Sequence, residues 1–431
     1  MKQLILTPLP HAITTAIELP GCIGYTIRAL NIAAMTKGSV KIVNPLKSDD
    51  TYHMFHALET LGISVKEEDN AFIVHGDISD IVEKEYIIDI GLSGRTARSV
   101  LGLLAIVPGT KIVTCQEPFK KRPIGDLVDG LRQLGAKIDY LENDEHLPVK
   151  ISSSKLTTNS AKMAGNLSSQ YFSSLMMIAP LLGGLTIDVT GEQSSKPFID
   201  MTIAIMKDFG VSVENNNYKR YTIKSGQHYN NPKIYEVEPE ATAASYFFAI
   251  AALTRSTIRI LYLNPNSAQG DIKFADVLHD MGCLVTKNGK EKWIEVTGTD
   301  ELHGITVSMN DTPDLVPTLA VVAAFAKGKT IITDIAHVRV KETDRIASPQ
   351  KELAKMGIKT EATEDTFTIL GGEPQAATID TYHDHRIAMA FAVAGSKITG
   401  MKINDPDVVT KSFPNFWKKL EELGMEVSYE K

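Results

Sequence analysis

The sequence predicts a two-domain α/β protein built from six copies of one βαβαββ unit, with helices inside and sheets outside. Three observations predict this fold class. A phrase in which a helix ends at a glycine recurs six times, and a small-residue helix precedes the copies. The chain also has 431 residues, more than one hydrophobic core usually organises.

The first recurring phrase is a helix ending in a large apolar residue and glycine, then a strand, a polar turn and a second strand. It is seen at 56–74 (HALETLGISVKEEDNAFIV) and at 352–370 (ELAKMGIKTEATEDTFTIL). The marking glycines, 73, 75, 72, 75 and 67 residues apart, are Gly62, Gly135, Gly210, Gly282, Gly357 and Gly424. A regular period of this size indicates a repeated supersecondary unit. Each glycine is expected to end its helix in the left-handed conformation that other side chains resist.

The second recurring phrase is a helix of small residues, then Gly or Ser, then a strand. Examples are AAMTKGSVKIVN (33–44) and AAFAKGKTIITD (323–334). Helices without a polar face are buried. Each unit therefore has the order βαβαββ, and its buried helix is expected to lie inside the sheets, which inverts the usual α/β layering.

Six units divide into two domains of three. Asn, Pro and charged residues interrupt the pattern at 227–242, and a first crossing is expected near Leu19-Pro20-Gly21. The expected domains are 20–238, and 1–19 together with 239–431. The N-terminal strand then belongs with the second half of the chain, whose last unit is short. Two crossings make a two-stranded hinge, which suits closure around ligands.

Composition excludes several classes of protein. Hydrophobic content of 43% and charged content of 23% are ordinary for a soluble globular chain, and a net charge of -7 argues against a general nucleic-acid surface. Pro8 and Pro10 interrupt the N-terminus, so a signal peptide is not expected, and no apolar run is long enough to span a bilayer. The three cysteines are far apart, which favours a reducing cytoplasm.

Two charged groups stand where α/β folds place their chemistry, directly before helices. RVKETDR at 339–345 follows a strand-like run, and HDHR at 383–386 precedes an Ala-rich helix. A solvated helix start would explain either group alone. Two together favour a shared site that grips an anion and moves protons, with Glu342 as an ionised base and His385 able to pass a proton. A metal site at His383 and His385 is disfavoured, because no further group has matching spacing.

Two serine-containing turns also precede helices. Ser168, Ser169 and Gln170 stand before a Met- and Leu-rich helix, where an ordinary N-cap explains them as well as a phosphate site does. Ser194 and Ser195 repeat the pattern one strand later and tilt the interpretation toward phosphate.

Six arginines are interpreted as lying at strand-to-helix transitions rather than inside helices: Arg28, Arg95, Arg98, Arg122, Arg345 and Arg386. Several guanidinium groups on one site would indicate a small polyanionic substrate. Asp314 also precedes an apolar helix, where a plain N-cap is a strong alternative. The nucleotide signatures GxxxxGK[ST] and GxGxxG with its acidic partner do not occur.

These motifs together resemble those of the 5-enolpyruvylshikimate-3-phosphate synthase family, essentially from end to end. RVKETDR (339–345) and DHR (384–386) are similar to its two most specific motifs. Further similar segments are SSQ (168–170), SKPFIDMT (195–202), KRPIGDLVDGLRQLGA (121–136), ASYFFA (244–249) and GDIKFADVL (270–278). The sister enolpyruvyl transferase acting on UDP-N-acetylglucosamine shares the fold but lacks the RVKETDR and DHR pair.

The resemblance implies an inside-out α/β barrel of six units in two domains. It also implies transfer of the enolpyruvyl group of phosphoenolpyruvate to the 5-hydroxyl of shikimate 3-phosphate, without metal or cofactor, by a cytoplasmic monomer. The implied ligands of the 3-phosphate are Ser168, Ser169, Gln170 and Ser195, and Arg28 would hold the shikimate carboxylate. Phosphoenolpyruvate would be held by Gly94, Arg122, Lys411, Arg345 and Arg386. Asp314 would take the hydroxyl proton and Glu342 the methylene proton, supported by Lys341 and His385.

The chain departs from the family pattern in two neighbouring signatures. Ile23 replaces a lysine that touches both substrates, Gly24 replaces a serine, and Arg95 follows Gly94 in the second signature. Three interpretations stay open: the standard reaction with Arg95 restoring the charge, a paralogue with another hydroxyl acceptor, or a non-catalytic ligand-binding relative. The first is favoured because the proton-handling residues and those that grip phosphoenolpyruvate remain. It predicts weak inhibition by glyphosate, and a larger loss of activity from Arg95→Ala than from Arg98→Ala.

Overall fold

The computed structural model describes residues 2–152, 155–166 and 168–430. The chain forms two compact units. The first unit contains Met1–Pro20 and Pro239–Lys431, and the second unit is the continuous segment Gly21–Glu238. Each is described below by itself.

The strands of the described residues form six four-stranded sheets, three in each unit. In every sheet the first two strands run parallel and the other two are added antiparallel. In spatial order, the second unit has β14 (Ile234–Glu236), β3 (Gly38–Val43), β5 (Ala71–Gly76), β4 (Ser64–Glu68); β6 (Glu85–Asp89), β7 (Thr110–Thr114), β9 (Val149–Ile151), β8 (Ile138–Tyr140); and β10 (Ser160–Ala164), β11 (Leu185–Thr190), β13 (Arg220–Ile223), β12 (Glu214–Asn216). The first unit has β2 (Thr14–Ile17), β15 (Thr257–Leu261), β17 (Trp293–Thr297), β16 (Leu284–Asn288); β18 (Thr306–Ser308), β19 (Lys329–Thr333), β21 (Phe367–Leu370), β20 (Lys359–Ala362); and β22 (Thr378–Ile379), β23 (Met401–Asn404), β1 (Gln3–Thr7), β24 (Glu426–Glu430).

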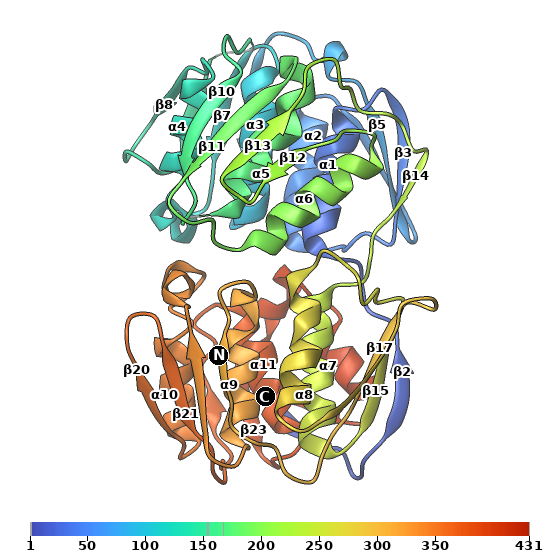
Figure 1. Ribbon diagram of the computed structural model, residues 1–431, viewed down its shortest axis with the longest axis vertical. Coiled ribbons are helices and arrows are strands. Elements are labelled where there is room, and N and C mark those ends of the chain that lie inside the picture. The colour runs from blue at the N-terminus through green and yellow to red at the C-terminus, as the bar shows by residue number, and fades with distance from the viewer. Residues whose placement is uncertain (1, 153–154, 167, 431) are drawn as a thin grey trace. The chain divides into compact units, whose positions relative to one another are not determined.

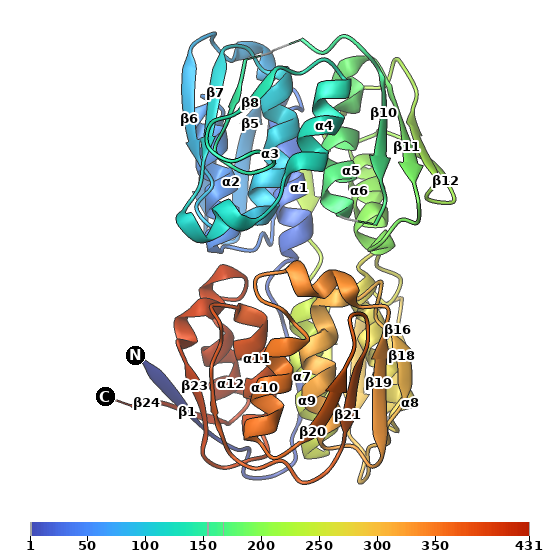
Figure 2. The same ribbon diagram turned by 90° about the vertical axis from the view of Figure 1, so that its left-hand side faces the viewer.

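The helices fall into two alternating classes. One class is almost wholly buried: α1 (Ile23–Ala34), α3 (Gly94–Ile106), α5 (Ser169–Ile178), α7 (Ala241–Thr254), α9 (Val316–Ala324) and α11 (His385–Gly395). The other buries only one face: α2 (Asp49–Thr60), α4 (Gly125–Gln133), α6 (Lys196–Asp208), α8 (Phe274–Asp280), α10 (Ala347–Lys355) and α12 (Phe416–Glu422). Figures 1 and 2 show the buried helices inside each unit and the sheets outside them, so the predicted inside-out layering is confirmed.

Three strands, β1, β2 and β14, pair with strands that lie far from them in the sequence. β2 precedes α1 yet pairs with β15, and β14 precedes α7 yet pairs with β3. β1 pairs antiparallel with both β23 and β24, and supplies the strand that the short last repeat lacks. The first unit is therefore assembled from both ends of the chain.

The six marking glycines adopt the conformation that the sequence predicts. Their φ angles are all positive, between +81° and +110°. Each follows a helix directly and turns the chain into the next strand, so the repeat period reflects a backbone requirement at the helix end.

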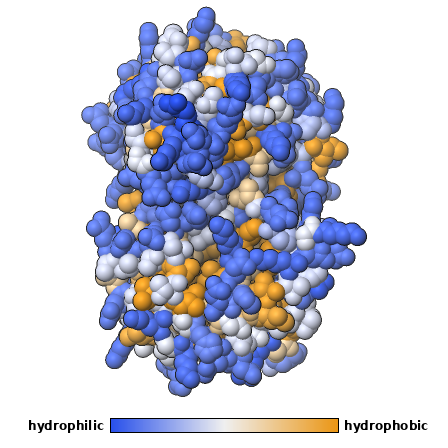
Figure 3. Space-filling view, in the orientation of Figure 1, coloured by the Kyte–Doolittle hydropathy of each residue, from blue (hydrophilic) through white to orange (hydrophobic). Residues whose placement is uncertain are grey.

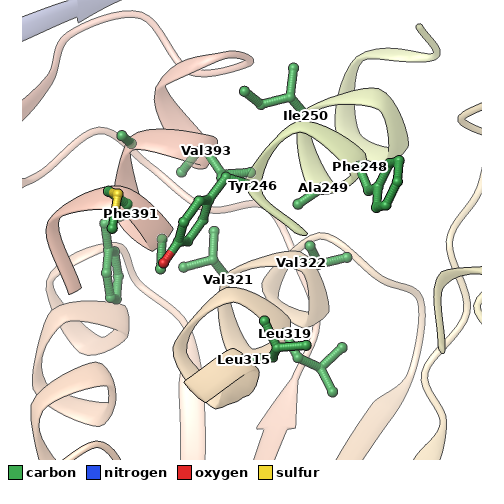
Figure 4. Close-up of a cluster of buried hydrophobic side chains, with 14 of the residues drawn as sticks. Tyr246, Phe248, Ala249, Ile250, Leu315, Leu319, Val321, Val322, Phe391 and Val393 are labelled. Carbon is green, nitrogen blue, oxygen red and sulfur yellow. The ribbon is translucent and has the colours of Figure 1, made fainter. Parts of the chain in front are cut away.

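The core of the first unit lies where α7, α9 and α11 pack together. Figure 4 shows apolar side chains of these helices interdigitating, with Tyr246 presenting its hydroxyl group among them. On the face drawn in Figure 3 most residues are hydrophilic, and hydrophobic ones form separate groups. None of the helices in the described ranges combines the length and the apolar character needed to cross a membrane.

Candidate functional site

The candidate residues of the first unit lie in the turns that lead into its buried helices, or beside them. Asp314 lies in the 3₁₀ turn η5 (Pro313–Leu315) before α9, and Arg386 is the second residue of α11. Glu342 and Arg345 lie between the 3₁₀ turn η6 (Ala336–Val340) and α10, and Lys411 ends η7 (Pro406–Lys411). Because α9 and α11 pack side by side, these turns come together.

Arg345 is the centre of this cluster, and it is only 1% exposed. Its Nη1 donates to Asp314 Oδ1 at 2.7 Å and its Nη2 to Glu342 Oε2 at 2.9 Å. Nε and Nη2 also donate to the two oxygens of Asp384, at 2.8 and 3.1 Å. Burial opposes the charge of Arg345, but Asp384, Glu342 and Asp314 outweigh it and raise the pKa of the guanidinium group above its ordinary value.

Asp314 bridges two arginines. Its Oδ1 accepts from Arg345, and its Oδ2 accepts from Arg386 Nη2 at 2.9 Å. Arg386 Nη1 also donates to the hydroxyl oxygen of Tyr246 at 3.3 Å. The N-cap alternative for Asp314 is wrong, because its carboxylate serves these guanidinium groups and η5 shows no side-chain cap.

Glu342 extends the chain of charges to a lysine. Its Oε1 accepts from Lys411 Nζ at 2.9 Å. The order Arg386, Asp314, Arg345, Glu342, Lys411 thus alternates in sign, and Asp384 adds the third carboxylate to three cations. A balanced buried cluster of this kind resists the removal of any one member.

His385 lies in the same cluster, but its state differs from the sequence-based prediction. Burial, with Arg386 and Lys411 nearby, lowers the pKa of His385 well below its ordinary value. The imidazole is therefore neutral near pH 7 and does not carry a proton there as a cation. Neither ring nitrogen has a hydrogen-bond partner among the described residues, and Nδ1 lies 3.5 Å from Asp384 Oδ1.

Lys341 follows the last residue of η6, close to a second, half-buried histidine, His337. Burial, with the charge of Lys341, lowers the pKa of His337 to about 4. His383, by contrast, is exposed and contacts Asp405 at 3.1 Å. His383 and His385 thus have opposite environments, and no group of three or more potential metal-ligating side chains occurs in the described part of the chain.

In the second unit, the two serine turns are tied together by one carbonyl oxygen. Gly165 O accepts from the backbone N of Ser194 at 2.9 Å and from Gln193 Nε2 at 3.1 Å. A Cβ on Gly165 would lie 2.8 Å from Glu192 O, so only glycine permits this approach. The N-termini of α5 and α6 are thereby held next to each other, an arrangement that favours an anion.

The serines occupy different positions in these turns. Ser168 is the N-cap of α5, and its Oγ accepts from the backbone N of Gln170 at 3.3 Å. Ser169 begins α5 and is buried. Ser195 is the N-cap of α6 in a left-handed conformation, with φ of +53° and no side-chain cap bond. Ser168 and Ser195 are therefore both N-cap residues, but only Ser168 makes a side-chain capping bond.

Arg28 differs from its predicted place at a strand-to-helix transition, because it lies inside α1. Nε donates to Thr202 Oγ1 at 2.8 Å, and Nη1 donates to the carbonyl oxygen of Gly24 at 2.9 Å. Nη2 donates to Ser173 Oγ at 3.3 Å and to Phe198 O at 3.1 Å. Burial, with the positive charge of Arg95 nearby, lowers the pKa of Arg28 to about 10.

Gly24 gives Arg28 the room to fold back. A Cβ at this position would lie 3.0 Å from Met201 Cε and 3.3 Å from Arg28 Nη1. Ile23, the residue before it, begins α1 and is buried. Where the family's first signature has a lysine and a serine, this chain therefore has the buried apolar residue Ile23 and Gly24, which contacts the guanidinium group of Arg28.

Arg95 and Arg98 lie on α3, and Arg122, which follows the 3₁₀ turn η2 (Glu117–Lys121), lies beside the first residue of α3. Gly94 is that first residue, and a Cβ there would lie 3.0 Å from Arg122 Nη1. Arg95 Nη1 lies 3.7 Å from Asp50 Oδ2, which is buried. The predicted position of Arg98 is wrong as well, because it lies in the second turn of α3, where it donates to Gln170 Oε1 at 3.3 Å.

Sequence reasoning missed several residues that shape the site. Asp384 belongs to the HDHR group, but its two hydrogen bonds with Nε and Nη2 of Arg345 were not predicted. Tyr246, Asp50 and Thr202 were not singled out either, because each stands in a run that reads simply as a helix. Only contacts between distant segments reveal them.

Comparisons with known proteins find one matching family along nearly the whole chain. Residues 9–420 match the family described as EPSP synthase (3-phosphoshikimate 1-carboxyvinyltransferase). The chain is 40% identical over 429 residues to the 3-phosphoshikimate 1-carboxyvinyltransferase of Sulfurovum sp. (strain NBC37-1), covering 98% of this chain and 100% of the relative. It is 39% identical over 431 residues to that of Shewanella baltica (strain OS195), with 98% and 100% covered.

Solved structures show the same fold. The EPSP synthase from Acinetobacter baumannii superposes with a TM-score of 0.83 at 22% identity, and 100% of both chains is covered. The enolpyruvyl transferase NikO from Streptomyces tendae superposes with a TM-score of 0.79 at 16% identity, covering 100% of this chain and 98% of that one. The fold is therefore shared by proteins with different names.

Proposed function

Because the chain belongs to the EPSP synthase (3-phosphoshikimate 1-carboxyvinyltransferase) family, we propose that it transfers the enolpyruvyl group of phosphoenolpyruvate to the 5-hydroxyl of shikimate 3-phosphate. The observation that carries this proposal is similarity along the whole chain. Relatives named for that activity are 39–40% identical to it and match 98% of its length.

The reaction joins the acceptor oxygen to C2 of phosphoenolpyruvate and breaks the bond from C2 to the phosphate oxygen. The hydroxyl proton leaves with phosphate, and the methylene carbon gains a proton and then loses it. A base for the hydroxyl and a group that exchanges the methylene proton are therefore needed. We assign these roles to Asp314 and Glu342, which the arginine and lysine contacts hold in place.

In the first unit, Arg345 and Arg386 would hold the carboxylate of phosphoenolpyruvate, and Lys411 would hold its phosphate. Lys341 and His385 support the two carboxylates. Because His385 is neutral, its part is to donate or accept a hydrogen bond. Such preorganised charges stabilise developing charge with little reorganisation.

In the second unit, the adjoining starts of α5 and α6 suit the 3-phosphate, with Ser168, Ser169, Gln170 and Ser195 as its ligands. Arg28 would hold the shikimate carboxylate. Gly94 and Arg95 at the start of α3, with Arg122 beside them, would bind the phosphate of phosphoenolpyruvate, since Arg122 packs against Gly94 and Arg95 adds a second guanidinium group.

The test is phosphate release from phosphoenolpyruvate by the purified protein, with and without shikimate 3-phosphate. Release that requires shikimate 3-phosphate, with an enolpyruvyl product found by mass spectrometry, is the expected result. A protein that binds phosphoenolpyruvate but releases no phosphate would contradict the proposal and favour a non-catalytic ligand-binding relative.

A second candidate is transfer of the same group to a different hydroxyl acceptor. Ile23, Gly24 and Arg95 are the changes that favour it, because they alter the starts of α1 and α3 while Asp314, Glu342 and Arg345 remain. The resemblance of the fold to NikO is neutral between the candidates. Phosphate release with other hydroxyl compounds, but not with shikimate 3-phosphate, would select this second candidate.

Organisation and location are also proposals. The compact units support domains at 20–238 and at 1–19 with 239–431, joined by two crossings. Cys22, Cys115 and Cys283 form no disulfide with one another, which supports a reducing cytoplasm. We propose a monomer that needs no cofactor, and light scattering coupled to size exclusion measures its mass directly.

A further inference from the structure

A buried carboxyl group lies beside the Asp314–Arg386 pair without belonging to it. Asp271 lies in the 3₁₀ turn η4 (Gly270–Lys273), which packs against α7, and it is 6% exposed. It makes no ion pair within the described residues. Its charged surroundings are Glu240 at the N-cap of α7, Asp314 on η5 and Arg386 on α11. On α8, which continues η4, Asp276 is already paired with Lys287 at 2.6 Å.

Three oxygen atoms form a chain at this point. Thr242 Oγ1 contacts Asp271 Oδ2, and it lies 3.2 Å from Glu240 Oε1. The threonine hydroxyl has a single hydrogen, so with both carboxyl groups ionised it would have to share that hydrogen between two carboxylate oxygens. A proton on one of the two carboxyl groups lets each contact be a separate hydrogen bond.

The charges identify which carboxyl group is protonated. Arg345, Arg386 and Lys411 are already matched by Asp314, Glu342 and Asp384. An ionised Asp271 would add a buried negative charge close to Asp314. Burial, with the like charge of Asp314, raises the pKa of Asp271 to about 7.

We propose that Asp271 is a positioning residue that works as a neutral carboxylic acid. Its proton bonds Thr242 Oγ1, and the hydroxyl of Thr242 in turn donates to Glu240. The group beside Arg386 then stays uncharged, and Arg386 remains on Asp314. When Asp271 ionises, its negative charge competes with Asp314 for Arg386 and the pair loosens. This inference rests on the proposed function, because Asp314 is the base only in that reaction.

The first test does not depend on activity. We would measure the thermal midpoint of unfolding against pH for the wild-type chain and for Asp271→Asn, which keeps a donor at the same place. A group whose folded pKa is raised loses its stabilising contribution as pH rises from the unfolded value to the folded one. The variant should therefore gain stability relative to wild type between about pH 4 and about pH 7, and the difference should then level off.

Two outcomes of the first test overturn the proposal. A constant difference across that range means that Asp271 is ionised throughout. The same comparison with Glu240→Gln is the second variant, and a pH-dependent gain there but not with Asp271→Asn would place the proton on Glu240 instead.

The second test measures kcat and KM for phosphoenolpyruvate against pH. Wild type should lose kcat on the alkaline side, whereas Asp271→Asn should keep kcat within roughly threefold near pH 6 and lack that decline. Asp276→Asn is the matched control on α8 and should retain the wild-type profile. An unchanged alkaline decline in Asp271→Asn would overturn the positioning role. Absence of activity in every variant, including wild type, would instead refute the proposed function and leave the stability result valid.

Discussion

At the scale of single residues, Arg345 shows how the site is held before any substrate binds. Its guanidinium group already donates to Asp314, Glu342 and Asp384. These partners use four of its five N–H groups, so holding a substrate carboxylate through two N–H groups requires the release of one partner. Both carboxylate oxygens of Asp384 accept from Arg345, and Oδ1 also caps α11 by accepting from the backbone N of Arg386. Asp314 or Glu342 is therefore the partner that we expect a substrate carboxylate to displace.

Asp314→Asn tests this arrangement. The substitution removes the negative charge shared by Arg345 and Arg386, so kcat should fall by about 100-fold or more. The free energy of unfolding should fall by about 3 kcal/mol, because two buried cations lose a counter-charge. Steady-state kinetics and urea unfolding measure the two effects. Asp276→Asn is the control, and wild-type kcat in Asp314→Asn would contradict the base assignment.

Arg95 is the residue expected to replace the missing cation at position 23. Arg95→Ala should lower kcat/KM for phosphoenolpyruvate by roughly 10- to 100-fold, the value of a charge-assisted contact. Arg98→Ala should cost less and act on KM for shikimate 3-phosphate, because Arg98 contacts Gln170. The exposed Arg132 provides an Ala control. Equal losses in kcat/KM for phosphoenolpyruvate in Arg95→Ala and Arg98→Ala would contradict the hypothesis that Arg95 replaces the missing cation.

Ile23 carries the prediction about glyphosate. An inhibitor that occupies the phosphoenolpyruvate position loses a cation there, because Ile23 is apolar and buried at the start of α1. Inhibition of the wild-type protein should be weak, and Ile23→Lys should tighten it. Inhibition constants against phosphoenolpyruvate measure both. Tight inhibition of the wild-type protein would show that another residue supplies this contact.

At the scale of elements, the repeat was readable from sequence because each copy needs a left-handed glycine after its helix. Gly62 and Gly357 have φ of +91° and +81°, and no atom lies within 4 Å of an added Cβ. Where a glycine instead permits close backbone approach, sequence gives no warning. Gly371 has no such φ, yet an added Cβ would lie 1.8 Å from Ala326 O.

Two alanine substitutions separate these reasons. Gly62→Ala should lower the free energy of unfolding by about 1 kcal/mol, through backbone strain alone. Gly371→Ala should cost several times more, because α9 must move to relieve the clash. Urea unfolding of both variants makes the comparison. Similar losses would mean that the loop at Gly371 adjusts freely.

The candidate site was only partly predictable at this scale. Charged groups next to helix starts pointed to Arg345 and Arg386, because a polar run before an apolar helix stands out, whereas Lys411 was expected only from the family resemblance. Arg28 and Arg98 were wrongly predicted to lie at strand-to-helix transitions. Each lies about one turn further along a buried helix than the sequence pattern suggests. The pairing of Asp384 with Arg345 spans 39 positions, and local sequence carries no signal for it.

At the scale of the whole molecule, the strand pairing brings the two ends of the chain together. β1 and β24 are antiparallel neighbours, with Gln3 opposite Glu430. A short linker between the ends would therefore make a hairpin like those of the other five sheets. A circular permutant opened in the exposed turn at Gly289 and Lys290 should fold, with a thermal midpoint within several degrees of wild type. Failure to fold would show that a free β1 is required.

The same pairing fixes the order in which the chain can mature on the ribosome. The second unit is one continuous segment, so it can complete its three sheets once residue 238 has emerged. β1 and β2 are synthesised earlier still, yet β1 can pair with β23 and β24 only after residue 430 has been synthesised. Throughout that interval its apolar residues Leu4, Ile5 and Leu6 have no sheet to join, and unpaired strands of this kind are where aggregation begins. During synthesis, the unpaired strand β1 is therefore a site where aggregation could begin until its partner strands have been made.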